Sequence, residues 1–307
     1  MTTRRFRRLL TPVSFTERTD AVLDYSRRIA QVNNGLVSLL HVVPTQSYRL
    51  LRSVYRPEES GGANTDYAEK VAHELLQEIG RTKIPGIPVD IILRRGANPA
   101  KVVLDVQRDV DPDLVVVGKS EFGEIGARLQ GGLAERIIRG ATCPVWSVSA
   151  DERFAKQESV RDVLAAIELD RSGITVVRGA RSVAEPQGGS VTLLHVLLTE
   201  PSFLELRRDA YGFESDEPVS LARAQKVALR RLEEIAAEHL KGIPHEVAVS
   251  VGYDRATTIL DEERSRSPSL IVMNAPLQSG FFQVVLGSDA ETVARGAACS
   301  VMTLRAR

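Results

Sequence analysis

Short apolar segments and amphipathic segments alternate along the chain. In the first half, runs rich in Val, Ile and Leu occupy residues 9–13, 36–43, 89–94, 114–117 and 145–148. Nearly continuous hydrophobicity over so few residues is typical of parallel strands that are buried on both faces. Helical periodicity lies between these runs, over residues 19–32, 66–82, 99–108 and 133–140. The pattern predicts an α/β fold with a doubly wound, five-stranded parallel sheet flanked by helices.

The second half of the chain shows the same alternation. Apolar runs occupy residues 163–167, 191–198, 247–251, 270–273 and 301–304, and a long helical pattern covers residues 221–239. The two halves are related, because residues 134–148 and 290–304 share 7 identities in 15 positions at an offset of 156. Background composition gives roughly one identity over such a length. The chain is therefore a tandem duplication, and each copy is long enough to bury its own core.

The duplication sets the expected domain boundaries. At about 150 residues per domain, a chain of 307 residues fits two domains. The polar segment 151–159 matches no counterpart in the other copy. We expect one domain over residues 1–150, a linker over residues 151–159 and a second domain over residues 160–307.

Composition and charge narrow the class of protein. The chain has 40 basic and 40 acidic side chains, which argues against a nucleic-acid binder that relies on the field of a whole domain. No apolar run approaches the roughly 20 residues that span a bilayer. The arginine-rich start lacks the apolar core and cleavage site of an export signal. The chain has only two cysteines, Cys143 and Cys299, which indicates a reducing compartment. Together these observations lead us to expect a cytoplasmic protein that binds neither nucleic acid nor membrane.

Candidate binding residues lie where the predicted strands end, since open parallel sheets bind ligands at the carboxyl ends of their strands. A glycine after a strand, followed by Gly-Gly or Gly-Ser at a helix start, offers backbone N–H groups to a phosphate. The alternative is that such a glycine only makes a turn. The expected positions are Ser14, Val43, Gly118 and Gly132 in the first copy and Glu168, Leu197, Asn274 and Ser288 in the second.

Two long connections follow the second predicted strand of each copy, over residues 44–65 and 199–219. A long connection that leaves the carboxyl end of a strand is a candidate lid over a ligand, and a surface excursion is the alternative. The second connection is apolar in places, as is the segment 280–287. These two segments could enclose a hydrophobic ligand, bury themselves in a partner, or simply pack under the neighbouring domain.

Several motifs of the chain resemble those of the universal stress protein family. They are Leu9-Leu10-Thr11-Pro12-Val13, Leu39-Leu40-His41-Val42-Val43, Asp113-Leu114-Val115-Val116-Val117-Gly118 and the segment 134–148. The resemblance covers nearly the whole chain, twice. It implies the strand order 3-2-1-4-5 in each domain, a cytoplasmic role in stress response and pairing of domains through the last strand. It also implies ATP binding in some members.

The resemblance marks residues for nucleotide binding. Members that bind ATP carry an aspartate at the end of the first strand and a Gly-x-x-Gly-(nine residues)-Gly-Ser/Thr loop. The candidate nucleotide-binding positions are Pro12, Ser14, Val43, Gly118, Gly131 and Gly132 in the first copy and Glu168, Leu197, Asn274, Gly287 and Ser288 in the second.

Both copies depart from that signature. Ser14 and Glu168 stand where the aspartate is expected, and Glu121 and Leu277 replace the second glycine. A carboxylate at Glu121 puts like charge beside a triphosphate, and the Cβ of Leu277 takes space that the backbone needs near a phosphate. Asn274 also replaces the first glycine of the second copy. We therefore expect ATP with magnesium to bind weakly or not at all.

Other reactive residues lack a catalytic arrangement. His41 and His195 occupy one repeated position inside an apolar strand, where burial or a hydrogen bond at the strand end explains them better than catalysis. The histidines show no metal-binding spacing. Cys143 and Cys299 fit small buried side chains, with a redox sensor as the alternative. The chain has neither a Gly-x-Ser-x-Gly elbow nor the pyrophosphate loop of adenylate-transferring enzymes.

These observations favour a non-enzymatic, cytoplasmic stress-response protein with degenerate nucleotide-binding sites that acts as a regulatory or scaffold module. We expect its two domains to pair within the chain, while a homodimer or other protein partners stay open. The alternatives are an ATP-binding switch with one functional site, or a protein that binds a hydrophobic small ligand in its second domain.

Overall fold

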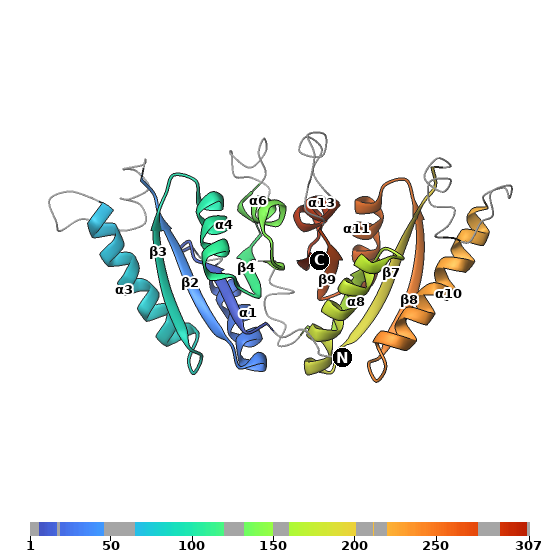
Figure 1. Ribbon diagram of the computed structural model, residues 1–307, viewed down its shortest axis with the longest axis horizontal. Helices are drawn as coiled ribbons and strands as arrows, with labels where there is room; N and C mark the ends of the chain where they lie inside the picture. Colours follow the sequence, from blue (N-terminus) through green and yellow to red (C-terminus); the bar gives the residue numbers. More distant parts are fainter. Residues whose placement is uncertain are drawn as a thin grey trace. The chain divides into compact units, whose positions relative to one another are not determined.

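The computed structural model describes residues 6–16, 19–45, 65–119, 132–149, 160–200, 211, 220–275 and 289–305. The chain divides into two compact units, the first over Arg5–Ala150 and the second over Asp151–Arg307 with Met1–Arg4. Each unit is one α/β layer structure with its own sheet (Figure 1).

The first unit alternates strand and helix as predicted. Its elements are β1 (Arg8–Pro12), α1 (Thr19–Asn33), β2 (Leu36–Val43), α3 (Thr65–Lys83), β3 (Val89–Arg95), α4 (Pro99–Val110), β4 (Leu114–Gly118), α6 (Leu133–Gly140) and β5 (Val145–Val148). The strands are parallel in the order β3-β2-β1-β4-β5, which confirms the order 3-2-1-4-5.

The second unit repeats this topology. Its elements are β6 (Asp162–Ala166), α8 (Arg171–Ala184), the 3-10 turn η1 (Glu185–Gln187), β7 (Ser190–Leu198), α10 (Leu221–His239), β8 (His245–Gly252), α11 (Arg255–Arg266), β9 (Leu270–Asn274), α13 (Asp289–Gly296) and β10 (Ser300–Leu304). The strands pair in parallel in the order β8-β7-β6-β9-β10.

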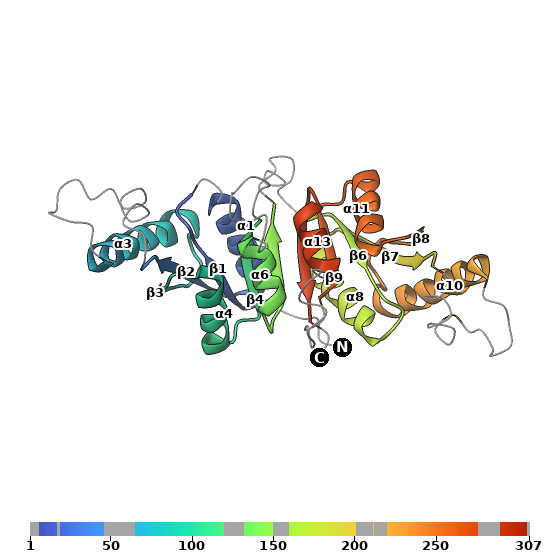
Figure 2. The same ribbon diagram turned by 90° about the horizontal axis from the view of Figure 1, so that it is seen from above.

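Helices cover both faces of each sheet. The strand order reverses direction at β1 and again at β6, so right-handed crossovers in the first unit place α1 and α3 on one face of the sheet and α4 and α6 on the other. In the first unit α1 packs on β1 and β4 and α3 packs on β2 and β3, whereas α4 packs against α6 (Figure 2). This double cover explains why the strands read as nearly continuous apolar runs.

The core lies along the central strands. Leu9, Leu10, Leu39, Leu40 and Leu114 come from three neighbouring strands and are all at most 1% exposed. The outer strand β3 is partly exposed, with Asp90 and both arginines at its end open to solvent. Burial is therefore shallowest at β3 and deep in β1 and β4, which carry the candidate site.

A buried acceptor recurs on one helix of each unit. The Gln107 side-chain carbonyl on α4 accepts a hydrogen bond from the backbone N–H of Thr142 at 3.2 Å. At an offset of 156, the Glu263 carboxylate on α11 accepts from the backbone N–H groups of Ala298 and Cys299, at 3.1 and 3.2 Å. Gln107 and Glu263 are 2% and 4% exposed. Each unit thus uses one long side chain to satisfy the backbone that leads into its last strand.

None of the helices that the structure describes is both long enough and apolar enough to cross a bilayer.

Candidate functional site

The predicted site residues lie along the carboxyl edge of each sheet. Pro12 ends β1, Val43 ends β2 and Gly118 ends β4, while Ser14 follows β1. In the second unit Leu197 lies on β7, Asn274 ends β9, and Glu168 follows β6. Gly132 precedes α6 as its N-cap. Gly131, Gly287 and Ser288 lie outside the described residues, as do Glu121 and Leu277.

This edge contains the switch point of each sheet. The strand order reverses between β1 and β4 and between β6 and β9, and open α/β sheets bind ligands in the crevice at that reversal. Ser14 and Gly118 flank the reversal in the first unit, as Glu168 and Asn274 do in the second. The candidate residues that the structure describes therefore lie at the carboxyl edge of both sheets, and their role in binding a ligand stays a prediction.

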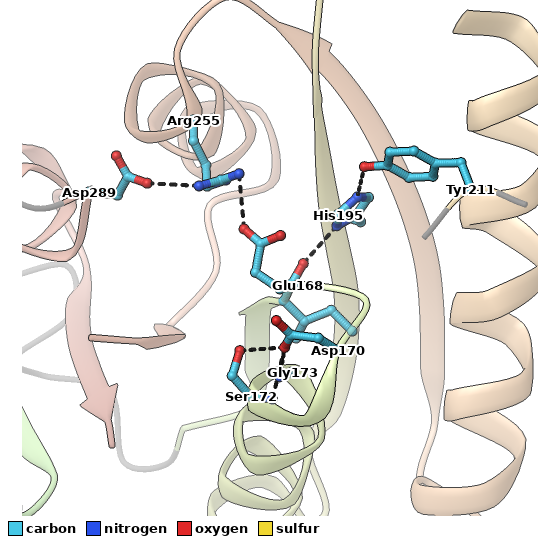
Figure 3. A network of polar contacts seen from close by, with 9 residues as sticks. Glu168, Asp170, Ser172, Gly173, His195, Tyr211, Arg255 and Asp289 are labelled. Atoms are coloured by element: carbon cyan, nitrogen blue, oxygen red, sulfur yellow. Dashed lines mark hydrogen bonds and ion pairs between the residues drawn. The ribbon is translucent and has the colours of Figure 1, made fainter. Parts of the chain in front are cut away.

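Charged side chains cross the switch point of the second unit. The Arg255 guanidinium, at the first position of α11, lies 3.0 Å from a carboxylate oxygen of Glu168. It also lies 3.2 Å from a carboxylate oxygen of Asp289, at the first position of α13 (Figure 3). All three side chains are partly buried. One guanidinium thus joins three elements, and the three side chains together carry one net negative charge.

Neighbouring helix starts are also capped by carboxylates. Asp254 caps α11 and accepts a hydrogen bond from the backbone N–H of Thr257 at 2.7 Å. Hydrogen bonds from the Thr257 side chain and backbone lower the pKa of Asp254 below its usual value. Asp170 caps α8 and accepts from the backbone N–H groups of Ser172 and Gly173 (Figure 3). Protein carboxylates therefore occupy the N-terminal ends of two helices at this edge.

Close packing fixes the turn after β6. A Cβ atom built on Gly173 would lie 1.9 Å from the backbone carbonyl oxygen of Glu168. Only a residue without a side chain lets α8 begin so near the strand end. This approach sets the position from which Glu168 reaches Arg255.

The first unit has a different edge. The hydroxyl groups of Ser14 and Thr16 lie 3.1 Å apart, where the second unit has the Glu168 carboxylate. Gly132 caps α6 without a side-chain hydrogen bond, and Arg136 in the next turn donates to the Asn98 side chain at 2.7 Å. The predicted site residues that the structure describes in this unit are all uncharged.

Each of the repeated histidines, His41 and His195, uses its Nδ1 atom for a hydrogen bond to the backbone. The Nδ1–H group of His41 donates to the backbone carbonyl of Val13 at 2.7 Å, and that of His195 donates to the carbonyl of Ile167 at 2.8 Å. Both side chains are buried, at 6% and 2% exposure. Burial lowers the pKa of His41, although its backbone hydrogen bond acts in the opposite direction. The predicted hydrogen bond at the strand end is confirmed in both units.

An aromatic ring contacts each histidine. Phe15, with a left-handed φ of 56°, lies on His41 with ring centroids 4.3 Å apart. The Tyr211 hydroxyl lies 3.1 Å from Nε2 of His195 (Figure 3). Val43 and Leu197 belong to the apolar clusters around these rings. The ends of the second strands are therefore lined by apolar and aromatic side chains.

The two cysteines are both buried. Cys143 is 7% exposed and Cys299 is fully buried, in keeping with the prediction of small buried side chains. Within the described ranges, no group of three or more His, Cys, Asp or Glu side chains could hold a metal ion.

Sequence reasoning overlooked Arg255 and Asp289. Their counterparts at an offset of 156 are Pro99 and Leu133, so charge appears in one copy where the other copy has an apolar residue. Comparing the two halves position by position for such changes would have found both residues. Their contact with Glu168 depends on the fold and has no local signal.

Two tandem α/β units, each with a five-stranded parallel sheet and candidate ligand positions at the switch point, define the class of protein. The sequence pattern of the universal stress protein family matches residues 5–149 and again residues 159–305. The chain therefore belongs to the universal stress protein family.

Individual relatives cover the whole chain at low identity. A universal stress protein of Mycolicibacterium smegmatis is 24% identical over 312 residues, which cover 97% of each chain. A universal stress protein structure from Archaeoglobus fulgidus has a TM-score of 0.70 at 19% identity, covering 98% of this chain and 97% of that one. A functionally unknown protein from Pseudomonas aeruginosa has a TM-score of 0.63 at 15% identity, covering 99% and 94%. At these identities the solved structures show a shared fold.

Proposed function

We propose that this universal stress protein works without catalysis, as a regulatory or scaffold module of the cytoplasmic stress response, and that its second unit does not hold ATP. The observation that carries the proposal is the pair of contacts from Arg255 to Glu168 and Asp289. Because two carboxylates engage the guanidinium, its positive charge is already compensated at the switch point.

The carboxylates at this edge of the second sheet disfavour the binding of a triphosphate. Two like charges about 4 Å apart repel by about 4 kcal/mol at an effective dielectric constant of about 20. Solvent reduces that repulsion here, because Glu168, Arg255 and Asp289 are 21%, 23% and 43% exposed. The excess negative charge still weakens the binding of an anion.

The start of α13 supports the same conclusion. Anions bind at helix N-termini because the first backbone N–H groups have no partner within the helix. Asp289 and Glu291 lie in the first turn of α13, and Glu291 has a counterpart in Glu135 of α6. Asp289 is therefore the carboxylate that distinguishes this helix start from that of the first unit, and a phosphate would have to approach against it.

A second candidate function rests on the first unit, as an ATP-binding switch with one functional site. Ser14, Gly118 and Gly132 place no charge at its switch point, and the first turn of α6 carries one acidic and one basic residue, Glu135 and Arg136. A helix N-terminus without a side-chain cap is open to an anion. If the protein holds ATP with magnesium, we expect the first unit to be the one that does so.

We also propose that the two domains pair within the chain. β5 and β10 are each the last strand at one edge of their own unit's sheet. An apolar edge strand is a template for pairing with another chain unless it is covered. Internal pairing predicts a monomer of two-domain mass on size-exclusion chromatography with light scattering, whereas an obligate dimer would mean that the edges pair between chains.

A thermal-shift titration with ATP and magnesium tests the nucleotide proposal. A true site at a hundredfold excess over its dissociation constant adds about 2.7 kcal/mol of stability. We expect no shift at micromolar ATP and no phosphate release above the rate without protein. A clear shift at micromolar ATP would contradict degenerate sites in the protein as a whole.

Matched variants assign any shift to one unit. Gly131→Val blocks the first loop, and Ser288→Ala removes the hydroxyl of the second. Loss of the shift in Gly131→Val alone would establish the switch of the first unit. Loss in Ser288→Ala alone would overturn the proposal that the second unit does not hold ATP.

A further inference from the structure

β8 forms one edge of the second unit's sheet. Among the strands that the structure describes in this unit, β8 pairs only with β7, at the end of the strand order opposite β10 (Figure 1). The backbone carbonyl of Gly252 accepts a hydrogen bond from the N–H of Thr199, which follows β7, at 2.9 Å. Backbone groups of successive strand residues point to opposite sides. Val247, Val249 and Val251 therefore direct their N–H and C=O groups away from β7, where no further strand lies within the described residues.

The corresponding edge of the first unit carries charge along its strand. β3 ends in Arg94 and Arg95, which are both exposed, and the Arg95 guanidinium is held by two carboxylates of α3. Charged side chains on an edge strand oppose its pairing with another strand. At an offset of 156 the second copy has Ser250 and Val251, and β8 carries no charged side chain after Glu246. The edge of the second sheet lacks the protection that β3 has.

A hollow lies beside the start of β8 on the side of α10. It has a volume of about 430 Å³, and its lining includes Glu233 and Ala236 of α10 and Val247 of β8. Ala236 and Val247 make part of the wall apolar, while the exposed Glu233 adds a carboxylate. Lysine and arginine side chains combine an apolar stem with a positive end, so they suit such a hollow.

A second hollow lies beside the same part of β8 on the side of α11. It has a volume of about 410 Å³, and its lining includes Asp162 of β6, Glu246 of β8 and Arg266 of α11. The Arg266 guanidinium lies 3.4 Å from a Glu246 carboxylate oxygen and 2.7 Å from one of Glu262. Because three carboxylates face one guanidinium, this hollow also favours a cation.

An edge strand between two hollows is the arrangement that binds an extended peptide as an added strand. In that mode the main chain of the peptide bonds to the edge, and pockets on the two faces take alternate side chains. Adjacent residues of an extended segment point to opposite faces, so two adjacent basic residues would place one cation in each hollow. The negative charge of both hollows therefore specifies the chemistry of the partner.

We propose that β8 is a docking edge for an extended, basic segment of a partner protein, which adds to the second sheet as a further strand. The main chain of the segment pairs with the outward groups of Val247, Val249 and Val251. An adjacent pair of lysine or arginine side chains enters the two hollows beside Glu233 and Glu246.

The docking edge goes beyond the proposed function and rests on it only in expecting a scaffold role, and hence a protein partner. Its residues lie on the outer strand and not at the switch point. ATP binding by the second unit would overturn the nucleotide proposal and leave the docking edge as it is. Failure of the peptide experiments would overturn the docking edge and leave the nucleotide proposal as it is.

The experiment measures the binding of a blocked, fluorescent peptide, Thr-Val-Lys-Lys-Val-Thr-Val-Thr, to the full-length protein by fluorescence anisotropy. We expect saturable binding that is at least about tenfold tighter than that of the same peptide with Glu-Glu in place of Lys-Lys. A third peptide is N-methylated at the alternate residues whose N–H groups would face β8. It keeps the charge but loses the main-chain donors, and we expect it not to bind. Equal binding of the N-methylated and unmodified peptides would overturn the inference, because attraction between charges alone would then explain the affinity.

Hydrogen exchange of the full-length protein locates the bound peptide. The outward N–H groups of β8 should exchange more slowly when the peptide is bound, so protection is expected over residues 245–252. Residues 89–95 of β3 are the internal reference and should be unchanged. Binding without protection of residues 245–252 would place the peptide elsewhere and overturn the docking edge.

A matched pair of variants tests the hollow on the side of α10. Glu233→Lys reverses a charge that lines the hollow, whereas Glu234→Lys reverses the next charge on the same helix, which does not line it. We expect about fivefold weaker peptide binding by Glu233→Lys and a change within about twofold for Glu234→Lys. Equal effects of the two variants would contradict a specific hollow.

Val247→Pro tests the main-chain contacts of the edge. Proline removes one outward N–H group, and an edge strand tolerates proline where its N–H faces solvent. We expect at least about tenfold weaker peptide binding by a Val247→Pro protein with a native circular dichroism spectrum. Undiminished binding would overturn the added strand, and the N-methylated peptide decides the same point if this variant does not fold.

A second copy of this chain is the competing occupant, since its β3 is an extended strand that ends in Arg94 and Arg95. Light scattering over a range of protein concentrations tests this alternative. Self-association that Glu233→Lys abolishes and Glu234→Lys does not would assign the edge to a second copy and overturn the proposed partner. We expect the mass of the protein to stay constant over the range in which the peptide binds.

Discussion

The carboxylate of Glu168 and the guanidinium of Arg255 lie 3.0 Å apart and connect the turn after β6 to the start of α11. The connection crosses the point at which the strand order of the second sheet reverses. In the first unit the equivalent positions are Ser14 and Pro99, which cannot form an ion pair. The two copies have therefore diverged at the place where a ligand of this fold would bind.

Substitution of Arg255 should lower the free energy of unfolding more than substitution of either carboxylate that contacts it. Arg255→Met leaves Glu168 and Asp289 facing each other without a cation, and we expect the free energy of unfolding to fall by about 1–2 kcal/mol. Glu168→Gln keeps the contact to Asp289 and should cost about 0.5 kcal/mol. Urea unfolding at low and high salt checks both values.

Salt provides the control for that prediction. At about 1 M salt the Debye length is about 3 Å, so the difference between Arg255→Met and wild type should shrink. A difference that is independent of salt would mean that Arg255 stabilises the unit by packing of its aliphatic stem instead.

The stability of the first unit should fall below about pH 6.5, partly through His41. Burial lowers the pKa of His41 in the folded protein from the ordinary value of 6.5. The unfolded chain therefore binds a proton first as pH falls, and stability that is complete above pH 6.5 is lost toward the folded pKa. One proton contributes at most about 1.4 kcal/mol per pH unit.

The variant His41→Asn isolates this contribution. Its amide nitrogen takes the place of Nδ1 and can still donate to the Val13 carbonyl, but it does not titrate. We expect the slope of unfolding free energy against pH between about pH 5 and 6.5 to become flatter than in wild type. An unchanged slope would assign the acid sensitivity to other groups.

At positions 107 and 263 we expect glutamine and glutamate to replace each other with little loss of stability, whereas alanine should destabilise the protein at either position. Glu263→Gln keeps an acceptor for the backbone N–H groups of Ala298 and Cys299, and we expect a loss below about 1 kcal/mol. Glu263→Ala leaves those groups without an acceptor in the interior and should cost about 1–3 kcal/mol. Chemical denaturation of both variants, with Gln107→Glu and Gln107→Ala as the matched pair, measures the contrast.

Gly173→Ala should destabilise the second unit although the change is small. The new Cβ would lie 1.9 Å from the Glu168 carbonyl oxygen, so α8 or the strand end must shift, at a cost of roughly 1–3 kcal/mol. Gly80→Ala on α3 is the control, because its Cβ would lie 3.3 Å from a movable Val89 methyl group. That variant should be neutral or more stable by up to about 1 kcal/mol, since alanine favours helix.

The fold was predictable because its signals are local and repeated. Each strand is a short apolar run, and the duplication lets every element be seen twice, as with Leu39–Leu40 and Leu193–Leu194. The strand order came from the family resemblance instead, since hydrophobic pattern does not say which strands are neighbours. The pairing of β1 with both β2 and β4 confirmed it.

The chemistry of the site was less predictable, since it depends on contacts between distant residues. Glu168 was recognised as a departure from the family signature, but nothing near it in sequence indicates that Arg255 compensates its charge. Tyr211 lies in a connection that showed only a general apolar character in sequence, and its hydrogen bond to His195 joins two residues that are 16 positions apart. Secondary-structure propensity and hydrophobic periodicity carry no information about contacts between residues that are distant in sequence.

The exchange of Gln107 for Glu263 between the copies also bears on chemical ageing. Glutamine side chains lose their amide slowly on prolonged heating and become glutamate, which is one reason why thermophilic proteins use fewer of them. At this position the product would be the residue type that the other copy already uses to hold the same stretch of backbone. Deamidation of Gln107 would therefore leave the backbone acceptor in place, and the first unit would age at this site without losing that support.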